Sequence, residues 1–86
     1  MTYDEALRRV EKGEMFEDYK TLKITDEYGY TVAHDQACKG WTTEDPEILK
    51  LANKKGYTVA HWQAIIGWKP KTKEAKAYIL AERLKE

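Results

Sequence analysis

The chain has 86 residues, of which 42% are hydrophobic and 35% charged, and its 15 basic and 15 acidic side chains balance to zero formal charge. This composition is typical of one small folded domain, and it excludes a low-complexity chain and a second globular domain. The apolar stretches are too short for a transmembrane helix or a signal peptide, so we expect a cytoplasmic protein without membrane association. A single cysteine, Cys38, excludes an internal disulfide framework and a thiolate-rich zinc site.

The N-terminal third predicts two helices. Thr2 followed by Glu5 resembles a capping box for a helix over residues 3–12. Asp18 is expected to cap a second helix that runs to about Thr25.

The middle of the chain predicts a third helix that packs closely against its neighbours. Thr31 can accept the free backbone N–H near His34 and so begin the helix. Ala33, Ala37 and Gly40 then recur at i, i+4 and i+7, which places small residues on one face. The glycine can end the helix by adopting a positive φ angle.

A fourth helix is expected to begin near Asp45 and Pro46, because aspartate is a good cap and proline suits the first helical position. It continues to about Ala52, and residues 53–56 then turn the chain. After a fifth helix that copies the third, residues 69–72 lead into a longer helix from about Thr72 to Lys85. The apolar face of this last helix comprises Ala77, Leu80, Ala81 and Leu84.

These elements form an internal repeat. Residues 29–41 and 56–68 match at ten of thirteen positions, 27 residues apart, and a fainter copy lies near the N-terminus. We therefore expect one domain, residues 1–86, with units at about 2–28, 29–55 and 56–86. The predicted fold is all-α: three stacked helical hairpins with a longer C-terminal capping helix.

The pattern of the repeat resembles that of the ankyrin family. The motif Asp-x-x-Gly-x-Thr-x-x-His-x-x-Ala-x-x-Gly extends from Asp26 to Gly40 and recurs with Asn53 in place of the aspartate. The resemblance covers residues 26–68. It departs from the family in two ways, since valine and alanine replace the usual proline and leucine and the period is 27 instead of about 33. Most of the segment that would form a projecting β-hairpin is absent, so we expect a compact relative of ankyrin repeats.

The resemblance implies structural roles for two histidines and their capping threonines. In ankyrin-like units this histidine bonds to the nearby threonine and to the backbone of the next unit, which assigns such roles to Thr31, His34, Thr58 and His61. The alternative, a metal pair made by His34 and Cys38, lacks further ligands and has Ile65 at the equivalent place in the next unit. No metal or other cofactor is predicted.

No catalytic motif is present, and we expect no enzymatic activity. The chain has no serine, no glycine-rich phosphate loop and no nucleophile beside a base. The repeated acidic pairs at residues 17–18 and 44–45 fit helix starts, where negative charge is stabilised by the helix dipole.

The outward positions of the last unit are more apolar than those of the unit before it. Three exposed-looking residues change from Asp35, Cys38 and Lys39 to Trp62, Ile65 and Ile66. We expect the closing helix or its linker to cover them; the alternative is an exposed patch for a partner.

Charge is distributed unevenly along the chain. Residues 1–28 hold five basic and eight acidic side chains, and residues 69–86 hold six basic and three acidic ones. The basic cluster beside Trp68 consists of Lys69, Lys71, Lys73 and Lys76. Lysines mixed with an aromatic ring can bind a nucleic-acid strand, although they also simply keep a small domain soluble.

We therefore expect a protein-binding or scaffolding module whose partner is another, unidentified protein. The alternatives are a nucleic-acid-associated protein that uses the basic cluster, and a chain that assembles head to tail through its oppositely charged ends. The resemblance and the aromatic content select these partner-binding residues: Tyr28, Tyr30, Lys39, Lys54, Lys55, Tyr57, Trp62 and Ile66. Trp41 and Trp68 are expected to pack between units.

Overall fold

The computed structural model describes residues 1–77, and the regular structure in this range is helical. The helices are α1 (Tyr3–Glu11), α2 (Tyr19–Leu22), α3 (Val32–Cys38), α4 (Pro46–Leu49) and α5 (Val59–Ile65). Residues 73–77 are also helical. The only β pairing found in the described range consists of two isolated antiparallel bridges, Thr25–Thr31 and Ala52–Thr58. The all-α prediction is therefore confirmed for this part of the chain.

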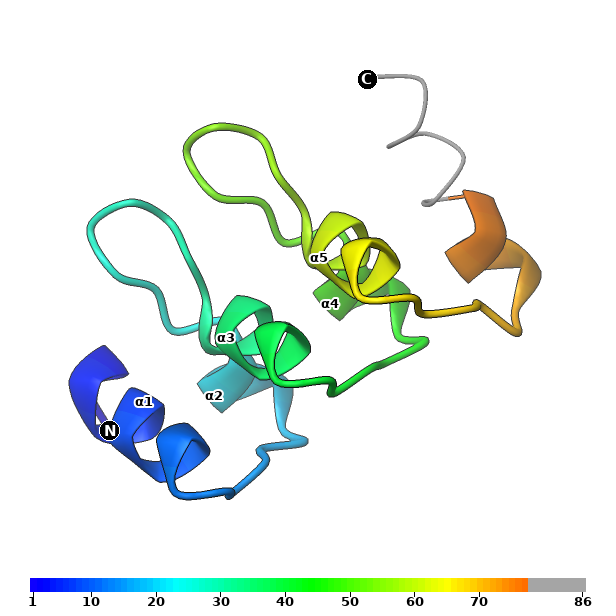
Figure 1. Ribbon diagram of the computed structural model, residues 1–86. Coiled ribbons are helices and arrows are strands. Elements are labelled where there is room, and N and C mark those ends of the chain that lie inside the picture. Colours follow the sequence, from blue (N-terminus) through cyan, green and yellow to red (C-terminus); the bar gives the residue numbers. More distant parts are fainter. Residues whose placement is uncertain (78–86) are drawn as a thin grey trace.

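The helices are arranged in two rows (Figure 1). The longer helices α1, α3 and α5 follow one another, with α3 packed against α1 on one side and α5 on the other. The short helices α2 and α4 lie beneath them, and residues 73–77 lie at the end of the molecule opposite α1. Elements that are 27 residues apart in the sequence thus occupy equivalent places.

Threonine and aspartate caps begin the helices, as the sequence predicts. The hydroxyl of Thr31 accepts the backbone N–H of His34 at 3.2 Å, and Thr58 caps α5 in the same way. Asp18 and Asp45 cap α2 and α4. Each cap satisfies a backbone N–H that the first turn of a helix leaves without a partner.

The second helices of the first two units are shorter than predicted, since α2 and α4 have only four residues each. The reason is a competing use of the backbone just beyond them. The carbonyl oxygens of Ile24 and Leu51 accept the N–H groups of Val32 and Val59, each at 3.0 Å. These bonds draw the chain out of the helix and attach it to the start of the next long helix.

The predicted C-terminal helix begins where expected, since the N–H of Ala75 donates to the hydroxyl of Thr72 at 3.1 Å. Residues 73–77 are equivalent to α2 and α4, being 54 and 27 residues further along. The rest of the prediction, including Leu80, Ala81 and Leu84, lies outside the described residues.

The core is shared between units. The larger cluster of buried residues comprises Ala6, Val10, Leu22, Val32, Ala33, Ile48 and Val59. A smaller cluster joins the last elements and comprises Leu49, Ala60 and Ala75, with Trp68 packed against it. The larger cluster thus joins residues of α1, α2, α3, α4 and the start of α5.

Candidate functional site

Two fully buried glutamines connect successive units. The amide of Gln36 accepts the backbone N–H of Phe16 at 2.7 Å and donates to the carbonyl oxygen of Phe16 at 3.1 Å. Gln63 makes the same two bonds to Thr43, at 2.9 and 3.2 Å. Each glutamine therefore fixes the loop between the two helices of the preceding unit.

Sequence reasoning missed both glutamines. The available signal was that the residue is identical in the two copies although the neighbouring position changes from Asp35 to Trp62. A polar side chain that repeats where outward positions vary indicates a buried hydrogen bond.

His34 also connects two units. Its Nδ1 accepts the backbone N–H of Thr31 at 3.1 Å, so Nε2 carries the ring proton and donates to the carbonyl oxygen of Tyr57 at 3.0 Å. Burial lowers the pKa of His34, despite the opposing effect of the Tyr57 carbonyl. With both nitrogens in use, this ring is not available to a metal ion. His61 is buried at the equivalent position, with its ring centre 4.9 Å from that of Tyr57.

Within residues 1–77, no three His, Cys, Asp or Glu side chains gather closely enough to hold a metal ion. The helices found in this same range all fall short of the length and apolar character needed to cross a bilayer.

Two projecting loops, residues 25–31 and 52–58, extend from the same side of the molecule (Figure 1). In the first, the carboxylate of Asp26 accepts the backbone N–H groups of Tyr28 and Tyr30, at 2.9 and 3.0 Å. In the second, Asn53 binds the two equivalent N–H groups at the same distances. The loops are therefore held rigidly by a side chain at their own base.

The two projecting loops also contact each other. The N–H of Lys54 donates to the carbonyl oxygen of Tyr28 at 3.0 Å. Gly29 has a φ angle of +85°, and a Cβ atom there would lie 2.8 Å from the nitrogen of Lys54. Only glycine allows this backbone approach.

Five of the predicted partner-binding residues lie on the projecting loops: Tyr28, Tyr30, Lys54, Lys55 and Tyr57. All except Tyr30 are exposed, and the exposed fractions of Tyr28 and Tyr57 are 63% and 43%.

Tyr30 and Trp62 are half-buried and pack against each other, with ring centres 6.2 Å apart. The equivalent contact one unit earlier joins Tyr3 and Asp35, since the tyrosine hydroxyl donates a short hydrogen bond to the carboxylate. The expectation that Asp35 is exposed is therefore wrong. Desolvation raises the pKa of Asp35, although the bond from Tyr3 acts in the opposite direction.

Lys39 and Ile66 lie at the far ends of α3 and α5, beyond the last helical residue of each. Each of these seven-residue helices separates them from the projecting loops by roughly 10 Å. The predicted partner-binding residues thus form two groups instead of one continuous surface.

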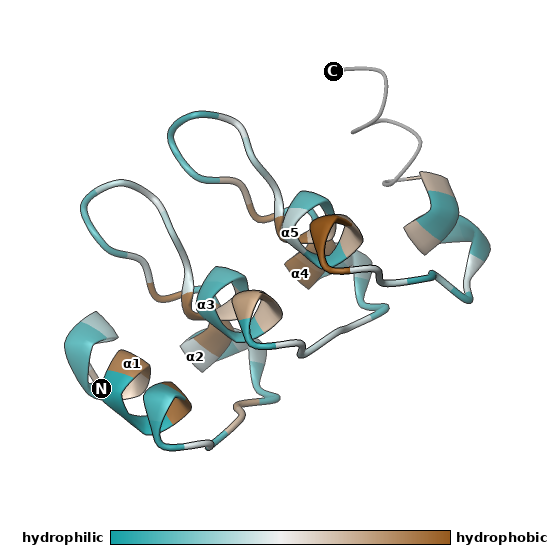
Figure 2. Ribbon diagram, in the orientation of Figure 1, coloured by the Kyte–Doolittle hydropathy of each residue, from teal (hydrophilic) through white to brown (hydrophobic). Residues whose placement is uncertain are grey.

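The last unit exposes two adjacent isoleucines. The exposed fractions of Ile65 and Ile66 are 59% and 44%, so residues 69–77 do not cover them. The rest of the predicted closing helix lies outside the described residues. Figure 2 shows the strongest hydrophobic colouring at this end of α5. Trp62 is half-buried, and its ring lies near those of Tyr30 and His61.

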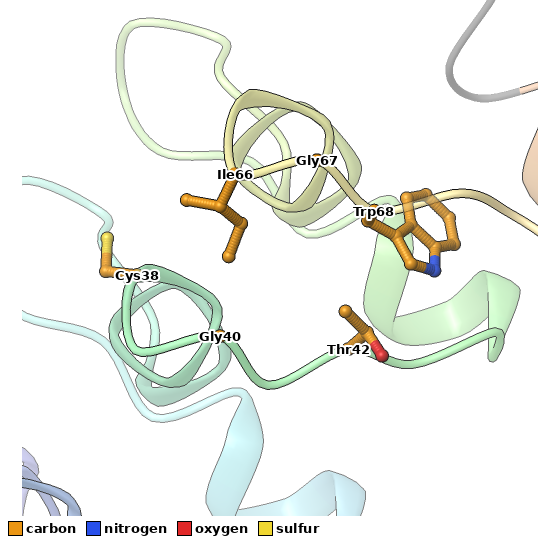
Figure 3. Close-up of a pocket in the computed structure, with 6 residues that line it drawn as sticks. All are labelled: Cys38, Gly40, Thr42, Ile66, Gly67 and Trp68. Atoms are coloured by element: carbon orange, nitrogen blue, oxygen red, sulfur yellow. The ribbon is translucent and has the colours of Figure 1, made fainter.

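A groove of about 450 Å³ lies between the ends of α3 and α5 (Figure 3). Its lining residues are Cys38, Gly40, Thr42, Ile66, Gly67 and Trp68. The side chain of Ile66 extends toward the end of α3, and Thr42 lies beside Trp68. Trp68 is half-buried and also packs against the smaller core cluster, while Trp41 packs against the larger one.

The four lysines of the basic cluster, Lys69, Lys71, Lys73 and Lys76, are all exposed. The carboxylate of Glu44 accepts the backbone N–H groups of Lys71 and Thr72, at 2.6 and 3.0 Å, and so attaches this segment to the middle unit.

No family model, curated protein or solved structure matches this chain. Its function therefore has to be inferred from its own residues.

Proposed function

We propose that this chain is a non-catalytic, ankyrin-like solenoid of three units that binds another protein in the cytoplasm. The equivalence of the contacts supports the solenoid. Gln36 and Gln63 make identical bonds to the preceding unit, and Tyr3 and Tyr30 each contact the residue 32 positions later. A contact that recurs with the period of the sequence is what stacked repeats produce.

Both ends of the stack differ from its interior, which argues against head-to-tail assembly. In the first unit the glutamine is replaced by Arg9, which is exposed and lies 3.8 Å from the carboxylate of Glu14. In the last unit the loop residue equivalent to Phe16 and Thr43 is Pro70, which has no N–H to donate. Neither end can repeat the glutamine contact, so a partner is expected to bind a lateral surface.

The observation that carries the proposal is the exposure of two tyrosines on rigid loops. Tyr28 and Tyr57 face solvent, while Asp26 and Asn53 hold the loop backbone beside them. Tyrosine contributes strongly to protein interfaces, and a loop that is already ordered loses little entropy on binding. The contacts between successive units do not explain why these two tyrosine rings are exposed.

Nucleic-acid binding by the basic cluster is the weaker candidate. Base stacking needs an accessible ring face, and Trp68 is half-buried against Leu49, Ala60 and Ala75. A carboxylate, Glu44, also contacts the backbone of the lysine segment.

Affinity capture from a cytosolic extract of the source cell, quantified by mass spectrometry, tests protein binding. We expect at least one protein to be enriched by the wild-type chain and lost with the double variant Tyr28→Ala/Tyr57→Ala. Tyr19→Ala is the matched control, because Tyr19 is 39% exposed but lies on α2, away from the projecting loops.

The proposal fails if the double variant captures the same proteins as the wild type. It also fails if the capture depends on RNA and disappears after nuclease treatment. Circular dichroism of all variants excludes misfolding as the cause of a loss.

A further inference from the structure

Two glycines that follow the ends of α3 and α5 line the groove between these helices. Gly40 and Gly67 have φ angles of +96° and +94°, and no atom lies within 4 Å of the place where either would carry a Cβ. The floor of the groove therefore lacks side chains at these two positions. Its volume of about 450 Å³ falls within the range of about 300 to 1,000 Å³ typical of ligand pockets.

The apolar residues at the groove are not required for stacking. The positions of Ile65 and Ile66 are occupied by Cys38 and Lys39 in the middle unit and by Glu11 and Lys12 in the first. All four of these equivalents are exposed. Two isoleucines at a position that the other units leave polar indicate a surface with a binding partner.

The rim of the groove is basic. Lys39 directly precedes Gly40, Lys69 directly follows Trp68, and both are exposed. Two acidic residues lie close to the lining in the sequence. The charge of Asp35 acts on Lys39 and Cys38, but its carboxylate accepts a hydrogen bond from the Tyr3 hydroxyl. Glu44 has one carboxylate oxygen engaged by two backbone N–H groups. Residues 69–77 hold four lysines, Lys69 included, against one glutamate. Complementary charge on a partner would therefore be negative.

From these observations, and given the protein-binding function proposed above, we infer that the groove binds a short peptide segment of another protein. A bulky apolar side chain of that segment enters between Ile66, Trp68 and Cys38. Carboxylates flanking it face Lys39 and Lys69. The apolar contact supplies affinity, and the charges select the partner.

Selection of a random twelve-residue peptide library, displayed on phage, against the immobilised full chain tests this inference. We expect enriched sequences to hold a bulky apolar residue within two or three positions of aspartate or glutamate. A fluorescein-labelled synthetic copy of the best sequence then gives dissociation constants by fluorescence polarisation.

Variants locate the binding site. Ile66→Lys is expected to weaken peptide binding at least tenfold, and it should fold because Lys12 and Lys39 occupy the equivalent positions. Lys39→Glu is expected to weaken binding by roughly threefold to tenfold. Lys12→Glu, the same change at the equivalent exposed position of the first unit, is the matched control and should leave binding unchanged.

Four results would overturn the inference: no enrichment, enrichment of basic peptides, equal affinity of Ile66→Lys and wild type, or efficient competition by a twenty-residue oligothymidine. Self-association of the wild type that is lost in Ile66→Lys, measured by sedimentation velocity, would assign the groove to a second copy instead. Peptides that bind Ile66→Lys normally but not Tyr28→Ala/Tyr57→Ala would reject the groove and leave the proposed protein-binding function intact.

Discussion

Helices α3 and α5 are nearly the same sequence in the same setting, and their few differences separate two kinds of residue. The threonine, histidine and glutamine are identical in both and buried in both. The three positions that differ begin with Asp35, which contacts Tyr3, and Trp62, which contacts Tyr30. The other two change from Cys38 and Lys39 to exposed isoleucines. Identity at the threonine, histidine and glutamine thus accompanies burial. The differing positions comprise one half-buried contact, made by Asp35 or Trp62, and two exposed positions.

The largest effect on stability is expected from substitutions at two glycines that occupy equivalent places in the two copies. Gly29→Ala and Gly56→Ala both force alanine into a positive φ angle, which costs about 1 to 2 kcal/mol. Gly29→Ala also places a methyl group 2.8 Å from the nitrogen of Lys54, whereas no atom lies within 4 Å at Gly56. We expect Gly29→Ala to lower the free energy of unfolding by at least about 3 kcal/mol and Gly56→Ala by only the smaller amount.

Urea denaturation of the two variants measures this difference. Equal losses would mean that the projecting loops do not approach each other as described.

The next effect concerns the buried glutamine. Gln36→Leu leaves the N–H and carbonyl of Phe16 without their partner, and we expect the free energy of unfolding to fall by about 2 to 3 kcal/mol. The matched change in the first unit, Arg9→Leu, alters an exposed residue and should cost no more than about 0.5 kcal/mol. Similar losses in the two variants would show that the glutamine position is not special to the interface.

A smaller effect is expected at the contact between Tyr3 and Asp35. Tyr3→Phe removes only the hydroxyl that donates to the carboxylate of Asp35 and should lower stability by about 1 kcal/mol. Tyr28→Phe, on an exposed ring, should leave the melting temperature unchanged. If Tyr3→Phe were equally silent, the bond would not contribute to stacking the first two units.

The smallest expected effect is the pH dependence of the free energy of unfolding that His34 and Asp35 produce. Burial lowers the pKa of His34 below its ordinary value of 6.5, so the unfolded chain binds a proton more readily than the folded one. The contribution of His34 to stability is therefore fully present above pH 6.5 and declines as the pH falls below it. Asp35 acts in the opposite sense, because its raised pKa reduces stability as the pH rises above 3.8.

Proton NMR of the His34 ring in the variant Asp35→Asn measures the titration of His34 in a chain from which the carboxylate of Asp35 has been removed. Titration of His34 at or above pH 6.5 would contradict its burial between the units.

The sequence predicted the helix starts because capping is a local interaction. Thr31 and Asp45 lie within a few residues of the N–H groups that they satisfy, so their spacing alone indicates the bond. Gln36 could not be interpreted in this way, because its partner Phe16 is 20 residues away and bonds through its backbone. The prediction that Asp35 is exposed was wrong for a related reason, because the side chain that contacts it, Tyr3, is 32 residues away in the sequence.

The exposure of Ile65 and Ile66 could also not be predicted from residues nearby in the sequence. Whether Ile65 and Ile66 are covered depends on where the C-terminal segment folds, and Ala75 of this segment packs instead beside Leu49 and Ala60. The sequence showed that the two residues were unusual for their position, but only the three-dimensional structure showed that they remain exposed.

Amide hydrogen exchange at Phe16 and Thr43 tests most directly whether successive copies build the interior together. Both residues lie in loops, and their N–H groups donate to glutamines of the following unit. The stacked arrangement predicts that both amides exchange as slowly as those of the buried helices, and that Gln36→Leu removes the protection at Phe16 alone. Exchange as fast as that of the neighbouring Met15 and Thr42 would contradict it.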